Sequence, residues 1–265
     1  MTVMLTSSTL SEKMLHVYRR DGYVVLPRLF EPDEIAILRA SAERELPSAE
    51  ILTKQDQDGN KVSLKMWGHA GDDIYGMFSR NERVVRAAER VIGEKIYLYS
   101  AKMILKNARE GGAWEWHQDY GYWYHNGCLM PDMTSCSIAV DANTEENGCL
   151  QVLKGSHLLG RLDHLRENDQ YVADKERVEV ALTRFQTVPV PLDPGDAILF
   201  HANLLHRSNA NKSDNRRWNF ICSYNGVSNR PFKRAREYGH DSDLRPVPAG
   251  AIRAFAAELI RREAH

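Results

Sequence analysis

The chain has 265 residues, of which 43% are hydrophobic and 27% are charged, and its formal net charge is -1. These values are ordinary for a globular protein, and the near-neutral charge gives no electrostatic drive toward nucleic acid or an anionic membrane. A chain of this length can bury a sizeable core without disulfides, so we predict one domain over residues 1–265.

The first 93 residues are predicted to be mainly helical. Ser11 can cap a helix that Asp21-Gly22 ends, and Asn81 can cap another that Gly93 ends. The predicted elements in this part are, in chain order, a helix over 11–20, a short apolar strand over 23–26, a helix over 32–46, a turn or hairpin at Asp58-Gly59-Asn60 within a polar stretch, and a helix over 81–92.

From residue 95 onward, short apolar segments alternate with turn signals. The candidate strands are 95–105, 113–119, 134–141, 149–153, 184–190, 196–201 and 215–225. Many short strands at such spacing favour an all-β sandwich or barrel. We therefore predict a double-stranded β-helix (a cupin-like jelly roll) over about 95–225, with the N-terminal helices packed outside it. Residues 158–183 read as an excursion with a helix, and 226–265 as a C-terminal extension that ends in a helix over 249–263.

The four cysteines show neither a C-x-x-C pair nor the spacing of a zinc ribbon. No sustained apolar run lies within residues 1–20, and no segment approaches the roughly 20 apolar residues of a membrane helix. The basic run 233–236 is short and lacks the strong net positive charge that accompanies nucleic-acid patches. We expect a cytoplasmic protein with a small-molecule substrate and no nucleic-acid or membrane partner. No feature of the sequence sets an oligomeric state.

The segment 114–120, Trp-Glu-Trp-His-Gln-Asp-Tyr, contains the first candidate metal ligands. His117 and Asp119 are two positions apart, so on a strand both side chains point to the same face. Two histidines and one carboxylate on one side of a six-coordinate metal leave three positions open, which is typical of non-haem iron(II) oxygenases. His-x-Asp alone occurs often by chance, so the assignment depends on a second histidine elsewhere.

The block 194–209 supplies that histidine, because its tight turn and strand lead to His206. Arg217 follows eleven positions later and could fork around a carboxylate with two parallel hydrogen bonds, as a dicarboxylate cosubstrate requires. Strand alternation places only one of Arg216 and Arg217 inside. His201, five positions before His206, is an alternative ligand by residue type alone.

Several blocks in order resemble the phytanoyl-CoA dioxygenase family of iron(II)- and 2-oxoglutarate-dependent oxygenases, especially its ectoine-hydroxylase-like and free amino-acid hydroxylase branches. The blocks span most of the chain and are 18–26, 116–123, 147–157, 194–217 and 224–225. The resemblance implies a jelly-roll oxygenase that uses iron(II), 2-oxoglutarate and O2.

Carried over position by position, the resemblance implies a role for ten residues. The iron ligands would be His117, Asp119 and His206; the 2-oxoglutarate contacts would be Arg217, Ser208 and Lys102; the substrate pocket would include Trp123, Phe200, Ser100 and Ile221. Ser100, Ile104 and Ile221 replace the family's glutamine, asparagine and phenylalanine, which argues against ectoine as the substrate. The retained Asp119 argues against the halogenating relatives.

The expected activity is hydroxylation of an unactivated C–H bond of a small polar or amino-acid-like metabolite, with release of succinate and CO2. Four alternatives stay open: desaturation, a phosphonate or acyl-CoA substrate, a metal-binding cupin-like protein without redox activity, and a zinc- or manganese-dependent isomerase. Arg217 together with Ser208 discriminates among these classes, because a site that holds only metal has no need of a buried carboxylate anchor.

Overall fold

Two antiparallel β-sheets organise the chain, which a computed structural model describes over residues 10–233 and 244–263. The seven-stranded sheet has the order β1 (Tyr23–Leu26), β11 (Ala197–His201), β6 (Met133–Ala139), β13 (Arg217–Gly226), β4 (Ile96–Lys106), β3 (Lys61–Trp67) and β2 (Leu52–Gln55). The four-stranded sheet has the order β10 (Thr187–Val190), β7 (Leu150–Leu153), β12 (His206–Ser208) and β5 (Trp114–His117). A separate hairpin joins β8 (His164–Glu167) to β9 (Gln170–Ala173). The predicted jelly roll is confirmed, in the form of two facing sheets rather than a closed barrel.

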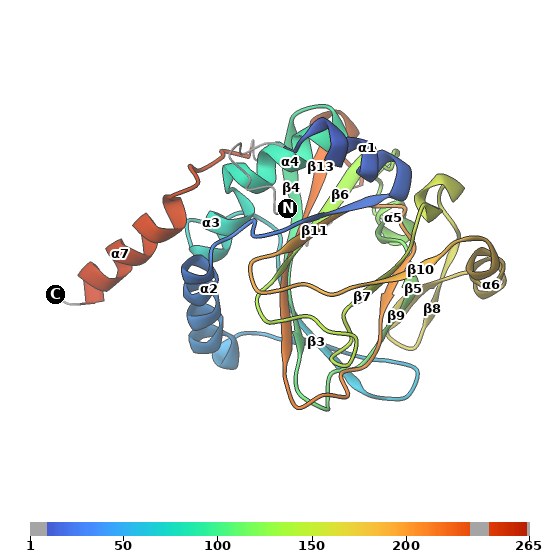
Figure 1. The fold of residues 1–265 in the computed structure, drawn as a ribbon, viewed down its shortest axis with the longest axis horizontal. Helices are drawn as coiled ribbons and strands as arrows, with labels where there is room; N and C mark the ends of the chain where they lie inside the picture. The colour runs from blue at the N-terminus through green and yellow to red at the C-terminus, as the bar shows by residue number, and fades with distance from the viewer. Residues whose placement is uncertain (1–9, 234–243, 264–265) are drawn as a thin grey trace.

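Helices cover the outer side of the larger sheet (Figure 1). They are α1 (Glu12–Asp21), α2 (Pro32–Glu45), α3 (Ile74–Ser79) and α4 (Glu82–Ile92), with a short 3-10 turn η1 (Leu46–Ser48) after α2. The remaining helical segments are α5 (Asp119–Trp123), η2 (Ser156–Leu159), α6 (Lys175–Arg184), η3 (Val227–Asn229) and α7 (Ala251–Glu263), the last packed against α2 and α3. No helix within the described ranges has the length and apolarity needed to cross a bilayer.

The predicted helix ends of the N-terminal part are confirmed. Ser11 Oγ accepts a hydrogen bond from the Met14 N–H at 3.3 Å, and Gly22 closes α1 with a φ of 82°. Asn81 caps α4, and Gly93 ends it with a φ of 90°. Such left-handed backbone favours glycine, because it carries no Cβ to clash with the preceding turn.

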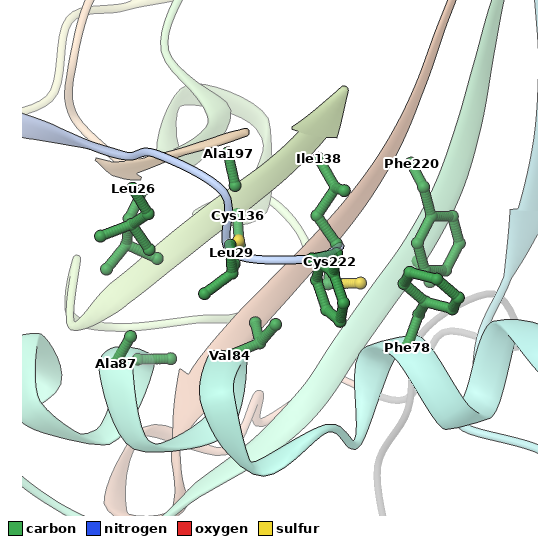
Figure 2. Packing of buried hydrophobic residues seen from close by; sticks show 14 of the residues in the cluster. Leu26, Leu29, Phe78, Val84, Ala87, Cys136, Ile138, Ala197, Phe220 and Cys222 are labelled. Atoms are coloured by element: carbon green, nitrogen blue, oxygen red, sulfur yellow. The ribbon is translucent and has the colours of Figure 1, made fainter. Parts of the chain in front are cut away.

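Strand alternation gives the larger sheet two different faces. On β13, Phe220 and Cys222 point to the helices, where Phe78 of α3 meets Phe220 edge-on with ring centroids 6.4 Å apart. Figure 2 shows Val84 of α4 against the same face. Side chains at the alternate positions, such as Arg217, line a cavity between the sheets. The helix side therefore forms the main apolar core, and the other face is left for polar chemistry.

Helices make up most of the N-terminal part, as predicted, and its strands β1, β2 and β3 join the larger sheet, β2 and β3 as a hairpin around Gly59. Two other expectations need correction. The predicted strand 113–119 ends at His117, and α5 begins at Asp119. The excursion 158–183 contains the β8–β9 hairpin as well as the helix α6. Residues 234–236 of the basic run lie outside the described residues.

Candidate metal centre

Three side chains converge between the two sheets at the ends of neighbouring elements. His117 ends β5 and His206 begins β12, and the two residues are paired across these strands. Asp119, the first residue of α5, places Oδ1 4.0 Å from His117 Nε2 and 3.9 Å from His206 Nε2. One donor atom of each residue lies within 4.8 Å of the others, which is the separation that one ion can bridge.

Backbone carbonyls fix the orientation of both imidazoles. His117 Nδ1 lies 2.6 Å from the Glu115 carbonyl oxygen, and His206 Nδ1 lies 2.8 Å from the Leu204 carbonyl oxygen. An Nδ1–H that donates to a carbonyl leaves the Nε2 lone pair directed at the centre, which is the usual outer-shell arrangement of metal-binding histidines. Burial lowers the pKa of both rings, so they are neutral and available as ligands.

Asp119 supplies the negative charge of the centre. Burial alone would raise the pKa of this carboxyl, but Lys102 and the hydrogen bond from Tyr122 hold the pKa below its ordinary value. Tyr122 OH donates to Oδ1 at 2.6 Å, and Ser135 Oγ donates to Oδ2 at 2.9 Å. Two neutral nitrogens and one fixed carboxylate are a donor set that would hold iron(II), and a cavity adjoins them.

Gln118, which lies between the candidate ligands His117 and Asp119, holds this segment in place. Gln118 is fully buried, and its Nε2 donates to the carbonyls of Gly160 and Asn203 at 2.8 and 2.7 Å. Its Oε1 accepts from the Leu162 N–H at 2.7 Å, and its own N–H donates to His164 Nε2 at 2.9 Å. Gln118 thereby ties the His117–Asp119 segment to the loop that leads into His206.

The backbone conformation of Gln118 explains why His117 and Asp119 converge although Asp119 is not on a strand. Gln118 is the N-cap of α5 and has extended backbone, with φ -115° and ψ 134°. One extended residue continues the strand alternation, so His117 and Asp119 still face the same side. The predicted geometry is therefore correct, whereas the predicted secondary structure is wrong.

A cavity of about 630 Å³ opens from the candidate metal centre. The ten predicted site residues all contribute to its wall: His117, Asp119, His206, Arg217, Ser208, Lys102, Trp123, Phe200, Ser100 and Ile221. Strand alternation supplies most of them, because Ser100 and Lys102 alternate on β4 as Arg217 and Ile221 do on β13.

Arg217 is a buried cation with little to bind inside the protein. Its Nε has no hydrogen-bond partner within the described parts of the chain, and its Nη1 lies 3.5 Å from Asn143 Oδ1. Burial lowers the pKa of this guanidinium to about 10, so the group stays charged at neutral pH. Arg216 points the other way, contacts Glu43 and Asp141, and lies over the Trp218 ring. Alternation thus leaves Arg217 as the inward arginine.

Two lysines of β4 lie near these groups, one beside the metal centre and one beside Arg217. Lys102 is half-buried in the cavity wall, on the side of the metal centre. Lys106 is fully buried and donates to the carbonyls of Ser208 and Asn209. Burial and the nearby Arg217 hold the pKa of Lys106 well below its ordinary value. Lys106 was not identified from the sequence, although its alternation with Lys102 indicates the inner face.

The other candidate residues fall into distinct places. Phe200 packs its ring 4.9 Å from that of His206, and Trp123 is buried against Tyr99. His201 is not a ligand of the centre, because its Nδ1 accepts from the Asn203 N–H and its ring neighbours His157. Exposed His125 lies at the cavity mouth.

Comparison with known proteins shows the same combination of fold and site chemistry. The sequence model of the phytanoyl-CoA dioxygenase family matches residues 18–218. The chain is 30% identical to an L-proline trans-4-hydroxylase of Streptomyces griseoviridis over 81% of this chain and 86% of that protein. It is 28% identical to an ectoine dioxygenase of Sphingopyxis alaskensis over 83% of this chain and 78% of that protein.

Solved structures give the same result. The structure of EctD from S. alaskensis with 2-oxoglutarate and 5-hydroxyectoine matches with a TM-score of 0.77 at 26% identity, over 93% of this chain and 90% of that chain. The structure of EctD from S. alaskensis with bound iron matches with a TM-score of 0.78 at 27% identity, over the same shares of both chains.

Proposed function

The chain belongs to the phytanoyl-CoA dioxygenase family and is an iron(II)- and 2-oxoglutarate-dependent dioxygenase, and we propose that it hydroxylates an unactivated C–H bond of a small, amino-acid-like metabolite. The observation that carries the proposal is that a metal-binding triad and a buried, nearly unpartnered arginine line one cavity. A site that only held metal would not need a buried arginine to bind a carboxylate.

We assign the three donor atoms, His117 Nε2, Asp119 Oδ1 and His206 Nε2, to iron. When bound, iron(II) with 2-oxoglutarate supplies the oxidising chemistry, in which O2 is consumed and succinate and CO2 are released. The protein holds the donors in place through the carbonyls behind each imidazole and through Tyr122 and Ser135 behind the carboxylate.

Arg217 and Ser208 are assigned to the distal carboxylate of 2-oxoglutarate. Ser208 is two positions after His206 on β12, so its hydroxyl and the metal ligand face the same side of the strand. Arg217 offers several donors in a planar fork, and a carboxylate would satisfy its unpartnered Nε. Lys102, on the metal side of the cavity, is assigned to the other end of the cosubstrate.

The substrate lies against Trp123, Phe200, Ser100 and Ile221 in this proposal. The L-proline and ectoine relatives act on amino acids or amino-acid-like compounds, which supports that substrate class here. Ser100 and Ile221 differ from the glutamine and phenylalanine expected of ectoine hydroxylases, so a compound other than ectoine is proposed.

A succinate-release screen across amino acids, ectoines, phosphonates and acyl-CoA compounds tests this function. We expect release above the uncoupled background with at least one amino-acid-like compound, and none from His117→Ala. If succinate is released only with a phosphonate or an acyl-CoA compound, the proposed amino-acid-like substrate class is wrong. Failure of the folded, iron-loaded protein to bind 2-oxoglutarate would overturn the function itself.

We further propose that residues 1–265 form one oxygenase domain, since β1, β2 and β3 from the N-terminal part complete the larger sheet. A cytoplasmic location is proposed because the four cysteines are free, buried thiols, as a reducing compartment would keep them.

A further inference from the structure

Strand β5 contains one extra residue where it lies beside β12. Across this strand pair, His206 is opposite His117. Ser208 is opposite Trp114, so two steps along β12 match three steps along β5. A β-bulge of this kind re-aims side chains and is common beside active sites. Trp114 therefore lines the cavity together with His117, although strict alternation would turn it to the outer face.

The indole N–H of Trp114 is a buried donor without a partner. No acceptor for it lies within residues 10–233 and 244–263. The indole ring centroid lies 6.1 Å from the centroid of the His117 ring, which places the side chain beside the metal centre. Because a buried, unpaired donor is unfavourable, a ligand that accepts a hydrogen bond from this N–H would be stabilised in the cavity.

A series of contacts connects Trp114 to the proposed carboxylate anchor. Arg217 on β13 is opposite Lys106 on β4, so both side chains are on the inner face of the larger sheet. Lys106 Nζ donates to the Ser208 carbonyl across the cavity at 3.4 Å. Ser208 is in turn opposite Trp114, and the Cβ atoms of such directly paired residues are typically about 5 Å apart. The four residues therefore lie at one level of the two sheets.

We propose that the indole N–H of Trp114 is a further donor to the distal carboxylate of 2-oxoglutarate, beside Arg217 and Ser208. The proposal rests on the proposed function and extends its cosubstrate site by one residue. An ionised carboxylate has about four lone-pair sites. Two N–H groups of the Arg217 guanidinium, the Ser208 hydroxyl and the indole N–H would together occupy them.

Trp218 offers a matched control for Trp114. Its indole N–H is also buried and has no acceptor in the described parts of the chain. Trp218 follows Arg217 on β13, so its side chain points away from the cavity, and the Arg216 guanidinium lies 4.1 Å from its ring centroid. Trp218→Phe therefore removes the same kind of group from the other face of the sheet.

Anaerobic calorimetry measures the contribution of the indole N–H to binding. Trp114→Phe keeps an aromatic ring and removes the donor. We expect the iron(II)-loaded variant to bind 2-oxoglutarate about tenfold more weakly than the parent, because one hydrogen bond to a charged acceptor is lost. Its affinity for iron(II) should stay unchanged. Trp218→Phe should change neither affinity.

Nuclear magnetic resonance tests whether the contact is direct. The chain has five tryptophans, and the indole N–H resonance missing from Trp114→Phe is that of Trp114. In the protein loaded with diamagnetic zinc(II), we expect this resonance to move downfield when 2-oxoglutarate is added and the Trp218 resonance to stay in place. If Trp114→Phe does not fold, Trp→Phe variants of the other four positions assign the resonance by elimination, and the shift in the parent decides.

The outcomes separate this inference from the proposed function. Unchanged 2-oxoglutarate affinity in Trp114→Phe, equal effects of the two variants, or a Trp114 resonance that stays in place would overturn the assignment of Trp114. A loss of iron affinity as large as the loss of 2-oxoglutarate affinity would also overturn it, because Trp114 would then act by supporting His117. In these cases the parent still binds 2-oxoglutarate, and the proposed function stands. If the iron-loaded parent does not bind 2-oxoglutarate, the proposed function and this inference fall together.

Discussion

Gln118 should be the most sensitive position of the metal centre that does not itself touch the metal. Gln118→Leu keeps the approximate volume but removes three side-chain hydrogen bonds, at 2.7 to 2.8 Å, from a fully buried site. The change leaves the carbonyls of Gly160 and Asn203 and the N–H of Leu162 without these partners. At about 1–2 kcal/mol for each buried group left unpaired, we expect a loss of about 3–6 kcal/mol of unfolding free energy.

Gln118→Leu should also weaken metal binding, because Gln118 links the two segments that carry the ligands. Mutation of outer-shell partners typically lowers metal affinity about 10- to 100-fold, and we expect a decrease in this range. Urea unfolding of the metal-free protein gives the first quantity, and anaerobic calorimetry with iron(II) gives the second.

The matched control is Gln151→Leu on β7, where the glutamine makes one half-buried hydrogen bond, from Arg207 Nε at 2.9 Å. We expect this control to lose no more than about 1 kcal/mol and to keep its iron affinity. A Gln118→Leu protein that loses no more stability than the control, and binds iron as tightly as the parent, would refute the proposed role of Gln118.

Three further predictions follow from the same contacts. Arg217→Gln should raise the 2-oxoglutarate concentration needed for half-maximal succinate release at least tenfold, whereas Arg216→Gln should leave it unchanged; the reverse result would make Arg216 the anchor. Tyr122→Phe removes the 2.6 Å hydrogen bond to Asp119 and should weaken iron binding about 10- to 100-fold in calorimetry, while Tyr124→Phe should not. Burial lowers the pKa of His164 to about 4 from its ordinary 6.5, so its contribution to stability is present above pH 6.5 and is lost as the pH falls toward 4. Urea unfolding should show about 2 kcal/mol lost through this group between pH 6.5 and 5, and a flat profile there would contradict the assignment.

Local sequence signals predicted much of the scaffold. Ser11 and Asn81 mark the helix starts, and Gly22 and Gly93 mark the helix ends, because capping depends on a few neighbouring residues. Most strands of the jelly roll were predicted from apolar runs, but the three-residue strand β12, which carries His206, was not. By contrast, β2 is largely exposed and polar, so its place in the larger sheet comes from pairing with β3 rather than from its own residues.

The metal centre was predicted as a residue set, but its supporting contacts were not. The family resemblance indicated His117, Asp119 and His206, and alternation limited the anchor to Arg216 or Arg217. Tyr122 was missed because no helix was predicted over 119–123; on a helix, its position three residues after Asp119 would have placed the two side chains together. The partners of Gln118 lie about 40 to 85 positions away along the chain, and no local pattern reveals such contacts.

Anaerobic titration with iron(II) and 2-oxoglutarate, followed by visible absorption, tests the central claim most directly. The wild-type protein should bind one iron per chain and develop a weak charge-transfer band that requires 2-oxoglutarate. His117→Ala and His206→Ala should lose both the iron and the band while their far-ultraviolet circular dichroism stays native. Well-folded wild-type protein without the band, or alanine variants that bind iron as tightly as the parent, would contradict the assignment of this centre.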